Sequence, residues 1–289
     1  DALFRHDGRA LDSFATQQGF GEPLYWMYWI HRIAATGDGD LWLGLGAGRL
    51  RFRTQGDRWA VAIDEPANGG LVRVAGGHPQ GRWQAIPFRQ AANGAPASGV
   101  WALAAGPGPG DLWIGTREGL WARGAHGLRR YGRSEGLPDD FVTALLVTGD
   151  ALVVGTIGGV ARIEGGRVSA GELRDPVLAL ADDGGGAAGA GRVWAGGPAG
   201  LDELEVVAGR PALVRRRGPA EGLAGVVHAL ARTPDGTMWV GTSEGLARLR
   251  AGRVEPWKQG LPDGEILSLA VDRAGGLWVG TAHGGVAWI

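Results

Sequence analysis

The sequence contains no cysteine, no long apolar run and almost no net charge. Without cysteine, neither disulfide bonds nor thiolate metal sites can form. No run of about 18 apolar residues occurs, so we expect no direct membrane insertion by this chain. Lysine and arginine together number 29 against 30 acidic residues. This balance leaves no basic field that would hold nucleic acid or an anionic membrane surface.

Motifs for catalysis and for cofactors are also missing. The sequence has no nucleophile elbow, no HExxH helix and no phosphate-binding loop. Its 6 histidines are scattered, and His31 and His228 have no third ligand at metal spacing. We therefore expect no catalytic residues, no metal site and no cofactor.

Glycine is abundant, and a repeat explains where it falls. The chain has 55 Gly and 15 Pro in 289 residues, yet 44% of its residues are hydrophobic, which favours a folded chain whose glycines form turns. Residues 235–252 read DGTMWVGTSEGLARLRAG, and residues 274–289 read AGGLWVGTAHGGVAWI. Similar stretches recur at intervals of about 40 residues. We call the residue at the Trp position of LWVGT the anchor of a repeat and assign seven anchors, the second of which divides a gap too long for one repeat. They are Trp42, Val72, Trp113, Val153, Trp194, Trp239 and Trp278.

The complete repeat predicts four short strands, at residues 226–232, 237–242, 245–252 and 253–259, the first of them innermost. The Asp-Gly, Glu-Gly and Ala-Gly steps between them are typical of tight hairpin turns. A four-stranded sheet cannot bury both faces alone, so the repeats should stack in a ring. We predict an all-β, seven-bladed β-propeller of four-stranded antiparallel blades, with residues 53–98 as its second blade and residues 1–289 as a single domain.

The two ends of the chain suggest how such a ring closes. Residues 2–20 are similar to the outer half of a blade, whereas the last repeat supplies only three strands. We expect the ring to be closed by an N-terminal strand near residues 9–15 joining the C-terminal blade. The strand-like residues 2–6 are then left without a place.

The motif GLPD…ILSLAVDRAGGLWVGT at 260–281, echoed at 136–147 and 222–249, resembles the two component regulator propeller repeat. The resemblance covers nearly the whole chain, and Val72 and Val153 depart from it by lacking the anchor tryptophan. It implies the extracytoplasmic input module of a bacterial sensor, of the kind placed ahead of a membrane span and a histidine kinase or diguanylate cyclase. It says little about the ligand.

Because the repeats share one structural scaffold, we expect the functional residues at positions where the repeats differ. Aligned innermost strands share an aliphatic column that we expect to be core, which includes Ile33, Val61 and Leu269. Two positions earlier stands a heterogeneous column: His31, Trp59, Trp101, Thr143, Leu178, His228 and Leu267. These side chains either face a ligand or fill gaps of different width between blades.

A second irregularity precedes the first innermost strand, where Tyr25, Trp26, Tyr28 and Trp29 cluster. Aromatic rings in a loop offer a rigid surface to a sugar ring or another flat ligand. The predicted ligand-binding residues are Trp26, Tyr28, His31, Trp59, Trp101 and His228. Turn residues that should rim the same face are Arg117, Glu118, Ser243, Glu244 and His283. Asp139, Asp140, Asp263 and Glu265 recur in the loops, and we interpret them as turn formers.

These observations predict a non-enzymatic ligand-sensing module in the periplasm or outside the cell. The expected partner is a small molecule or a glycan. Two alternatives stay open: a scaffold that binds a protein partner or a further copy of itself, and a propeller enzyme that resembles streptogramin lyases.

Overall fold

The structure is a computed structural model, and it describes residues 3–6, 11–14, 30–45, 50–55, 58–63, 70–75, 83–87, 99–125, 127–184 and 192–289. The chain divides into two compact units, residues 1–51 with 61–131 and residues 52–60 with 132–289. The single-domain organisation stays a prediction.

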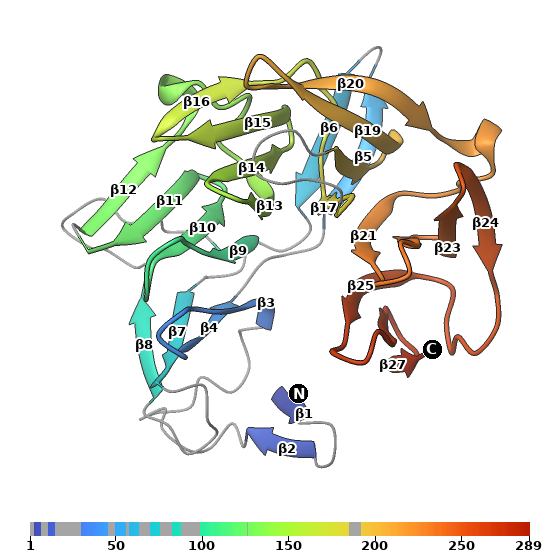
Figure 1. Cartoon of the computed structure of the whole chain (residues 1–289), viewed down its shortest axis with the longest axis horizontal. Helices are drawn as coiled ribbons and strands as arrows, with labels where there is room; N and C mark the ends of the chain where they lie inside the picture. Colours follow the sequence, from blue (N-terminus) through green and yellow to red (C-terminus); the bar gives the residue numbers. More distant parts are fainter. Residues whose placement is uncertain are drawn as a thin grey trace. The chain divides into compact units, whose positions relative to one another are not determined.

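Four consecutive antiparallel sheets have four strands each, in chain order (Figure 1). The first comprises β9 (Ala102–Ala105), β10 (Leu112–Thr116), β11 (Gly119–Gly124) and β12 (Gly127–Tyr131). The second comprises β13 (Val142–Thr148), β14 (Ala151–Thr156), β15 (Gly159–Glu164) and β16 (Arg167–Ala170). The third comprises β17 (Ala179–Asp182), β18 (Val193–Gly197), β19 (Gly200–Val207) and β20 (Arg210–Arg217). The fourth comprises β21 (Val227–Arg232), β22 (Met238–Thr242), β23 (Gly245–Arg250) and β24 (Arg253–Trp257). The four-stranded antiparallel repeat is therefore confirmed.

The N-terminal part of the repeat differs from the prediction. One sheet has the order β3 (Ile30–Ala35), β4 (Leu41–Leu45), β7 (Gly70–Val74) and β8 (Trp83–Pro87). Between β4 and β7 the chain inserts a separate two-stranded sheet, β5 (Leu50–Gln55) and β6 (Arg58–Ile63). Val72 lies in β7, the third strand of the sheet that begins with β3, and pairs with Leu43 of β4. The assignment of Val72 as a second anchor and of residues 53–98 as a blade was therefore wrong. Trp59 and Val61 lie in β6 and belong to no innermost strand.

The remaining strands form two smaller sheets. The last sheet has three strands, β25 (Ile266–Val271), β26 (Leu277–Thr281) and β27 (Val286–Trp288). Near the N-terminus, β1 (Leu3–His6) pairs only with β2 (Leu11–Phe14). Leu3 stands opposite Phe14 as Leu246 stands opposite Trp257 in β23 and β24. The hairpin thus resembles the outer half of a blade. In the described part of the chain β2 does not pair with the β25–β27 sheet, so closure of the ring by this strand stays a prediction.

The repeated tryptophans lie in the second strand of their sheets and form the core. Trp42, Trp194 and Trp239 are buried, and Trp113 and Trp278 are half-buried. Two of the rings contact an aromatic side chain from the fourth strand of their own sheet. Tyr131 lies 6.1 Å from Trp113, and Trp257 meets Trp239 edge-on at 5.2 Å. Four residues of the aliphatic column pack against clusters of buried hydrophobic side chains, as predicted: Leu103, Leu180, Leu230 and Leu269. Ile33 is 49% exposed, so the prediction that it belongs to the core was wrong.

The glycine after the anchor gives space to the next sheet. A Cβ on Gly44 would lie 2.6 Å from Cγ1 of Val100, and a Cβ on Gly155 would lie 2.7 Å from Cγ1 of Val177. Gly241 is placed in the same way, 2.6 Å from Cγ2 of Ile266. Each β-branched residue precedes the innermost strand of the next sheet or begins it, so the repeated Trp-x-Gly pattern sets how neighbouring sheets pack.

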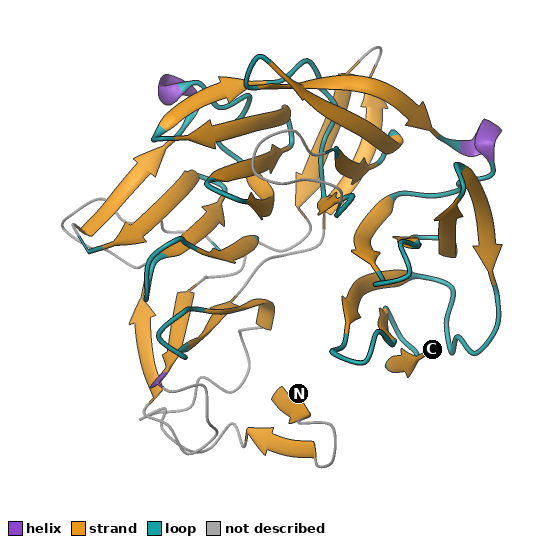
Figure 2. Cartoon of the chain, in the orientation of Figure 1, coloured by secondary structure: helices purple, strands orange, loops and turns teal. Residues whose placement is uncertain are grey.

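The turns also repeat. After the second strand, the hydroxyl of Thr242 donates to the carbonyl of Gly245 at 3.0 Å and accepts from the amide of Glu244 at 3.1 Å. Thr116 and Thr156 make the same two bonds. Helix in the described ranges is confined to short 3-10 turns such as Arg133–Glu135 and Pro219–Glu221 (Figure 2). None of the helices in these ranges is long and apolar enough to cross a bilayer.

Candidate functional site

The heterogeneous column coincides with a β-bulge that recurs at the start of the innermost strands. The pairing register shifts between Ile30 and Arg32, between Val142 and Ala144, between Val227 and Ala229, and between Ile266 and Ser268. The residue skipped by the ladder in each case is His31, Thr143, His228 or Leu267. A bulge leaves one residue unpaired and turns its side chain away from the regular alternation. The sequence variation therefore falls on the one position of the strand that the ladder does not restrain.

The bulge side chains have different surroundings. Thr143 is buried, and its hydroxyl donates to the carbonyl of Val177 from the next sheet, which is a packing role. Leu267 is 43% exposed, and His228 is half-buried. Trp101 belongs to the same column and is only 5% exposed, which favours the interpretation that it fills a gap.

The other predicted site residues are less defined. For His31 and Trp59 the structure describes the strands, β3 and β6, and Trp59 has lost its place in the column because β6 belongs to the inserted sheet. Trp26 and Tyr28 lie outside the described residues. That these six residues form one site stays a prediction.

Among the bulge residues whose side chains the structure describes, His228 is the polar one that keeps access to solvent. Burial lowers the pKa of its imidazole, and the negative charge of Glu265 acts in the opposite direction. The ring is therefore neutral near pH 7 and offers one donor and one acceptor. Such a side chain can bind a hydroxyl or an amide of a neutral ligand.

Loops around this position are held together within each sheet. The amide of Val226 donates to the hydroxyl of Ser243 at 3.0 Å, and the amide of Ser243 donates back to the carbonyl of Val226 at 3.0 Å. The amide of His283 donates to Asp263 at 3.0 Å. The loop before the innermost strand thus lies beside the turn after the second strand, as predicted for Ser243 and His283. We call this edge the loop face.

Three of the four recurring loop carboxylates accept hydrogen bonds from backbone amides of their loops, as expected for turn formers, and for Glu265 this role stays a prediction. Asp139 accepts from the amide of Phe141 at 2.9 Å, and Asp140 accepts from the amide of Arg133 at 3.0 Å. Asp263 accepts from the amide of Gly264 at 2.6 Å. Within the described ranges, no group of three His, Cys, Asp or Glu could hold a metal ion.

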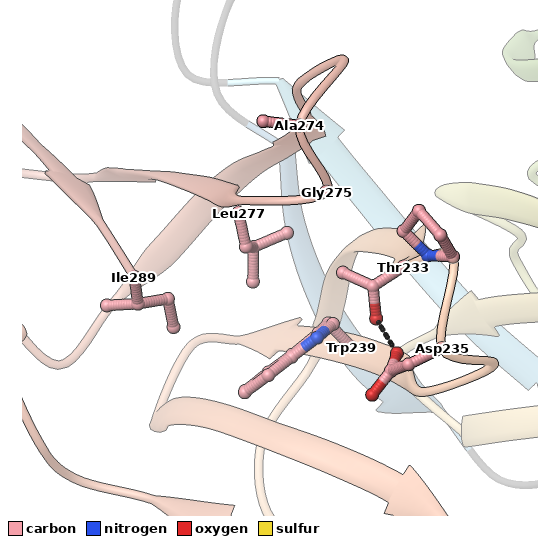
Figure 3. Close-up of a pocket in the computed structure, with 8 residues that line it drawn as sticks. Thr233, Asp235, Trp239, Ala274, Gly275, Leu277 and Ile289 are labelled. Atoms are coloured by element: carbon pink, nitrogen blue, oxygen red, sulfur yellow. Dashed lines mark hydrogen bonds between the residues drawn. The ribbon is translucent and has the colours of Figure 1, made fainter.

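A cavity lies at the opposite ends of these strands, between the β21–β24 and β25–β27 sheets. Its volume is about 330 Å³, and its lining consists of Thr233, Pro234, Asp235, Trp239, Ala274, Gly275, Leu277 and Ile289. Figure 3 shows the indole of Trp239 between the Thr233–Asp235 turn and the side chains of Leu277 and Ile289. We call this space the Trp239 cavity. Its volume falls at the lower end of the range of small-ligand pockets.

One wall of the Trp239 cavity carries a negative charge. The hydroxyl of Thr233 donates to Asp235 at 2.6 Å, and the amide and hydroxyl of Thr237 donate to it at 3.1 and 2.9 Å. These bonds, with a smaller effect from the charge of Arg250, lower the pKa of Asp235 to about 2. The carboxylate is therefore ionised at any physiological pH.

Sequence reasoning missed this cavity because its residues repeat. Trp239 was assigned to the frame and the Thr233–Thr237 turn to hairpin chemistry, and both assignments are confirmed. The available signal was Ile289, which pairs with Leu277 in the position where Arg123 pairs with Leu112.

Comparisons with known proteins give a consistent result. The model of the two component regulator propeller family matches residues 222–244 and 260–283. Each match runs from the loop before an innermost strand to the turn after the second strand. A search of curated proteins finds no match.

Solved structures resemble the chain in fold. The extracellular domains of two hybrid two component systems of B. thetaiotaomicron are 17% and 15% identical, with TM-scores of 0.58 and 0.61. The matches cover 93% and 90% of this chain and 39% and 40% of those chains, so this chain spans about two fifths of their length. A streptogramin B lyase structure is 14% identical, with a TM-score of 0.55, over 93% of this chain and 95% of that one.

The family model confirms the resemblance predicted from the LWVGT pattern at residues 222–244 and 260–283, and the solved structures agree with it in fold. Residues 222–244 and 260–283 therefore carry two component regulator propeller repeats.

Proposed function

We propose that the chain is a non-enzymatic, ligand-sensing propeller module that works outside the cytoplasm as the input part of a bacterial signalling protein. The observation that carries this proposal is the recurring bulge. A constant frame holds the strands, and the bulge residue is free to differ from sheet to sheet. The family match and the extracellular sensor domains support the same role.

The ligand is proposed to be a small molecule or glycan fragment that binds on the loop face. His228 supplies a neutral imidazole at the start of β21, and Ser243 and His283 rim the face on the turns beside it. Predicted partners of this surface are His31, Trp26 and Tyr28. This surface offers an imidazole and hydroxyl groups for hydrogen bonds and has no strong positive or negative electrostatic field. Such a surface suits a neutral ligand that is rich in hydroxyl groups.

We also propose that the sheets occupy places in a seven-bladed ring. Six sheets of three or four strands follow one another, and the β1–β2 hairpin has the register of an outer blade half. We place that hairpin in the seventh position, beside the β25–β27 sheet. A crystal structure with six blades in a closed ring, and β1–β2 outside it, would contradict this arrangement.

The sensing proposal is tested by a thermal-shift screen of oligosaccharides and small metabolites. A ligand that binds only the folded chain raises its melting temperature. His228→Gln should weaken a true hit by about tenfold, the loss expected for one hydrogen bond at a partly buried site. Arg253→Ala, an exposed change on β24, is the matched control and should leave the shift unchanged.

Two results would overturn the proposal. Consumption of a hit, seen as loss of substrate by mass spectrometry, would favour a lyase activity instead. A complete screen without any stabilising compound, combined with stable binding of another protein, would favour the scaffold alternative.

A further inference from the structure

The Trp239 cavity has a counterpart in the N-terminal unit, where the same place is filled. The turn from Thr36 to Asp40 and the indole of Trp42 correspond to the turn from Thr233 to Thr237 and the indole of Trp239. Asp38 accepts from the Thr36 hydroxyl at 2.6 Å, as Asp235 accepts from Thr233. The repeat therefore provides an internal comparison for the cavity.

At the counterpart, an arginine from the next sheet covers the indole. Arg123 places its guanidinium 4.8 Å from the ring centroid of Trp42 and donates through Nη1 to the carbonyl of Gly110 at 2.8 Å. A Cβ on Gly110 would lie 2.9 Å from Oδ2 of Asp38, so the backbone at Gly110 runs close to that carboxylate. The indole face of Trp42 and the carbonyl of Gly110 thus hold one guanidinium, and the Asp38 carboxylate lies beside the same backbone.

The cavity presents the same three surfaces. Gly275 stands in the place of Gly110, two residues before the first residue of its strand, and its backbone lines the cavity with Asp235 and Trp239. A Cβ on Gly275 would lie 3.5 Å from Pro234, so the two turns approach each other as they do at Gly110. From the described part of the chain, Oδ2 of Asp235 accepts one hydrogen bond, from Thr237, and a carboxylate oxygen has room for a second.

Ile289 takes the position of Arg123 but brings no cation. Both residues pair with the first residue of the second strand in their sheet, Leu277 and Leu112. At the Trp194 interface the equivalent residue is Leu249, which packs with Trp194 and Met238. There the guanidinium of Arg217 lies 4.9 Å from the indole centroid. Two of the three buried anchor indoles therefore carry a guanidinium, and the third borders the cavity.

We propose that the Trp239 cavity is a binding site for a guanidinium group, supplied either by a free guanidino compound or by an arginine side chain of a peptide. The flat cation stacks on the Trp239 indole and donates to the Gly275 carbonyl and to the Asp235 carboxylate. A guanidinium fits this combination better than an ammonium because it is planar, less strongly hydrated and able to donate in several directions at once. The site lies at the far end of the strands from the loop face, so it is independent of the sensing proposal.

The direct test is isothermal titration of the chain with agmatine and with N-carbamoylputrescine, which we call the neutral analogue because an uncharged urea of the same shape replaces the guanidinium. The ammonium group at the other end is the same in both compounds, so the comparison isolates the guanidinium charge. Agmatine should bind at a single site, and the neutral analogue should bind at least tenfold more weakly. Titrations with a Gly-Arg-Gly and a Gly-Lys-Gly peptide, both blocked at the ends, distinguish the sources. Binding of the arginine peptide indicates a side chain on a partner, and binding of agmatine alone indicates a free compound.

Two variants locate the site. Ile289→Arg rebuilds the arrangement of Arg123 and should abolish agmatine binding while it raises the melting temperature. Ile289→Leu keeps an aliphatic wall and is the matched control, with binding unchanged. Asp235→Asn keeps an acceptor for the turn and should weaken binding by about tenfold, the loss expected for one charge-assisted hydrogen bond. This second variant keeps the proposal testable if Ile289→Arg fails to fold.

The proposal is overturned by equal affinity for agmatine and its neutral analogue, by the absence of saturable binding, or by unchanged binding in a folded Ile289→Arg variant. The reciprocal change gives a further check. Arg123→Ala should open a second cavity over Trp42 and lower the melting temperature, and added methylguanidinium should restore part of the loss in this variant and not in Trp42→Leu.

Discussion

Gly241→Ala is the sharpest test of how neighbouring sheets are held together. The new methyl group would lie 2.6 Å from Cγ2 and 3.1 Å from Cβ of Ile266, which is fully buried at the start of β25. Neither atom belongs to a flexible chain end, so the β25–β27 sheet must shift. Overpacking of this kind costs about 1 to 3 kcal/mol.

That loss corresponds to a melting temperature lower by roughly 2 to 10 °C for a chain of this size. Thermal unfolding followed by circular dichroism measures the difference. Gly264→Ala is the matched control, since nothing lies within 4 Å of a Cβ there, and its melting temperature should not change. If Gly241→Ala is as stable as Gly264→Ala, the absence of a side chain at residue 241 is not needed for the next sheet to pack.

A double-mutant cycle identifies the partner. Ile266→Ala removes the Cγ2 atom and leaves a cavity, at a cost of about 2 to 5 kcal/mol. In the double variant, the methyl group on residue 241 fills part of that cavity, so the combined loss should be smaller than the sum of the two. Strict additivity would contradict direct packing between Gly241 and Ile266.

Three further outcomes are expected. Trp239→Ala should lower the free energy of unfolding in urea by about 3 to 5 kcal/mol, whereas Trp288→Ala, 60% exposed, should cost far less; equal losses would refute the assignment of Trp239 to the frame. The lowered pKa of His228 means that the unfolded chain binds the proton more readily, so stability should fall as pH drops below about 6.5; His228→Gln should flatten the melting temperature between pH 7.5 and 5, and an unchanged slope would contradict this. Thr242→Val should cost about 1 kcal/mol by removing two turn hydrogen bonds, and a neutral result would show that the turn does not need them.

The sequence predicted the strands well where the repeat is complete. In the β21–β24 sheet every predicted strand is present, because hairpin turns and the anchor tryptophan fix both period and register. The error at Val72 has a physical cause. The insertion at residues 50–63 is itself a β-hairpin with apolar residues, so periodicity could not separate it from a blade. The Gly70-Leu71-Val72-Arg73 stretch did carry a signal, since it matches Gly245-Leu246-Ala247-Arg248 in a third strand.

The candidate sites were less accessible to sequence reasoning. The heterogeneous column could be found from alignment, but not that it marks a bulge, because a bulge depends on pairing across strands. Trp101 illustrates the limit: an aromatic residue at a variable position can be buried as readily as exposed. The Trp239 cavity depends on what a neighbouring sheet places over an indole, which becomes visible once Arg123 and Ile289 are seen at equivalent positions.

The most direct measurement is the indole N–H spectrum of the 13 tryptophans, recorded by NMR during titration with agmatine. Our hypothesis is that the residues common to the repeats carry the fold and that departures from the common pattern carry function. It predicts a saturable shift at Trp239 and none at Trp42 or Trp194, whose faces already hold Arg123 and Arg217. Equal shifts at all three anchors, or no shift at Trp239, would contradict it.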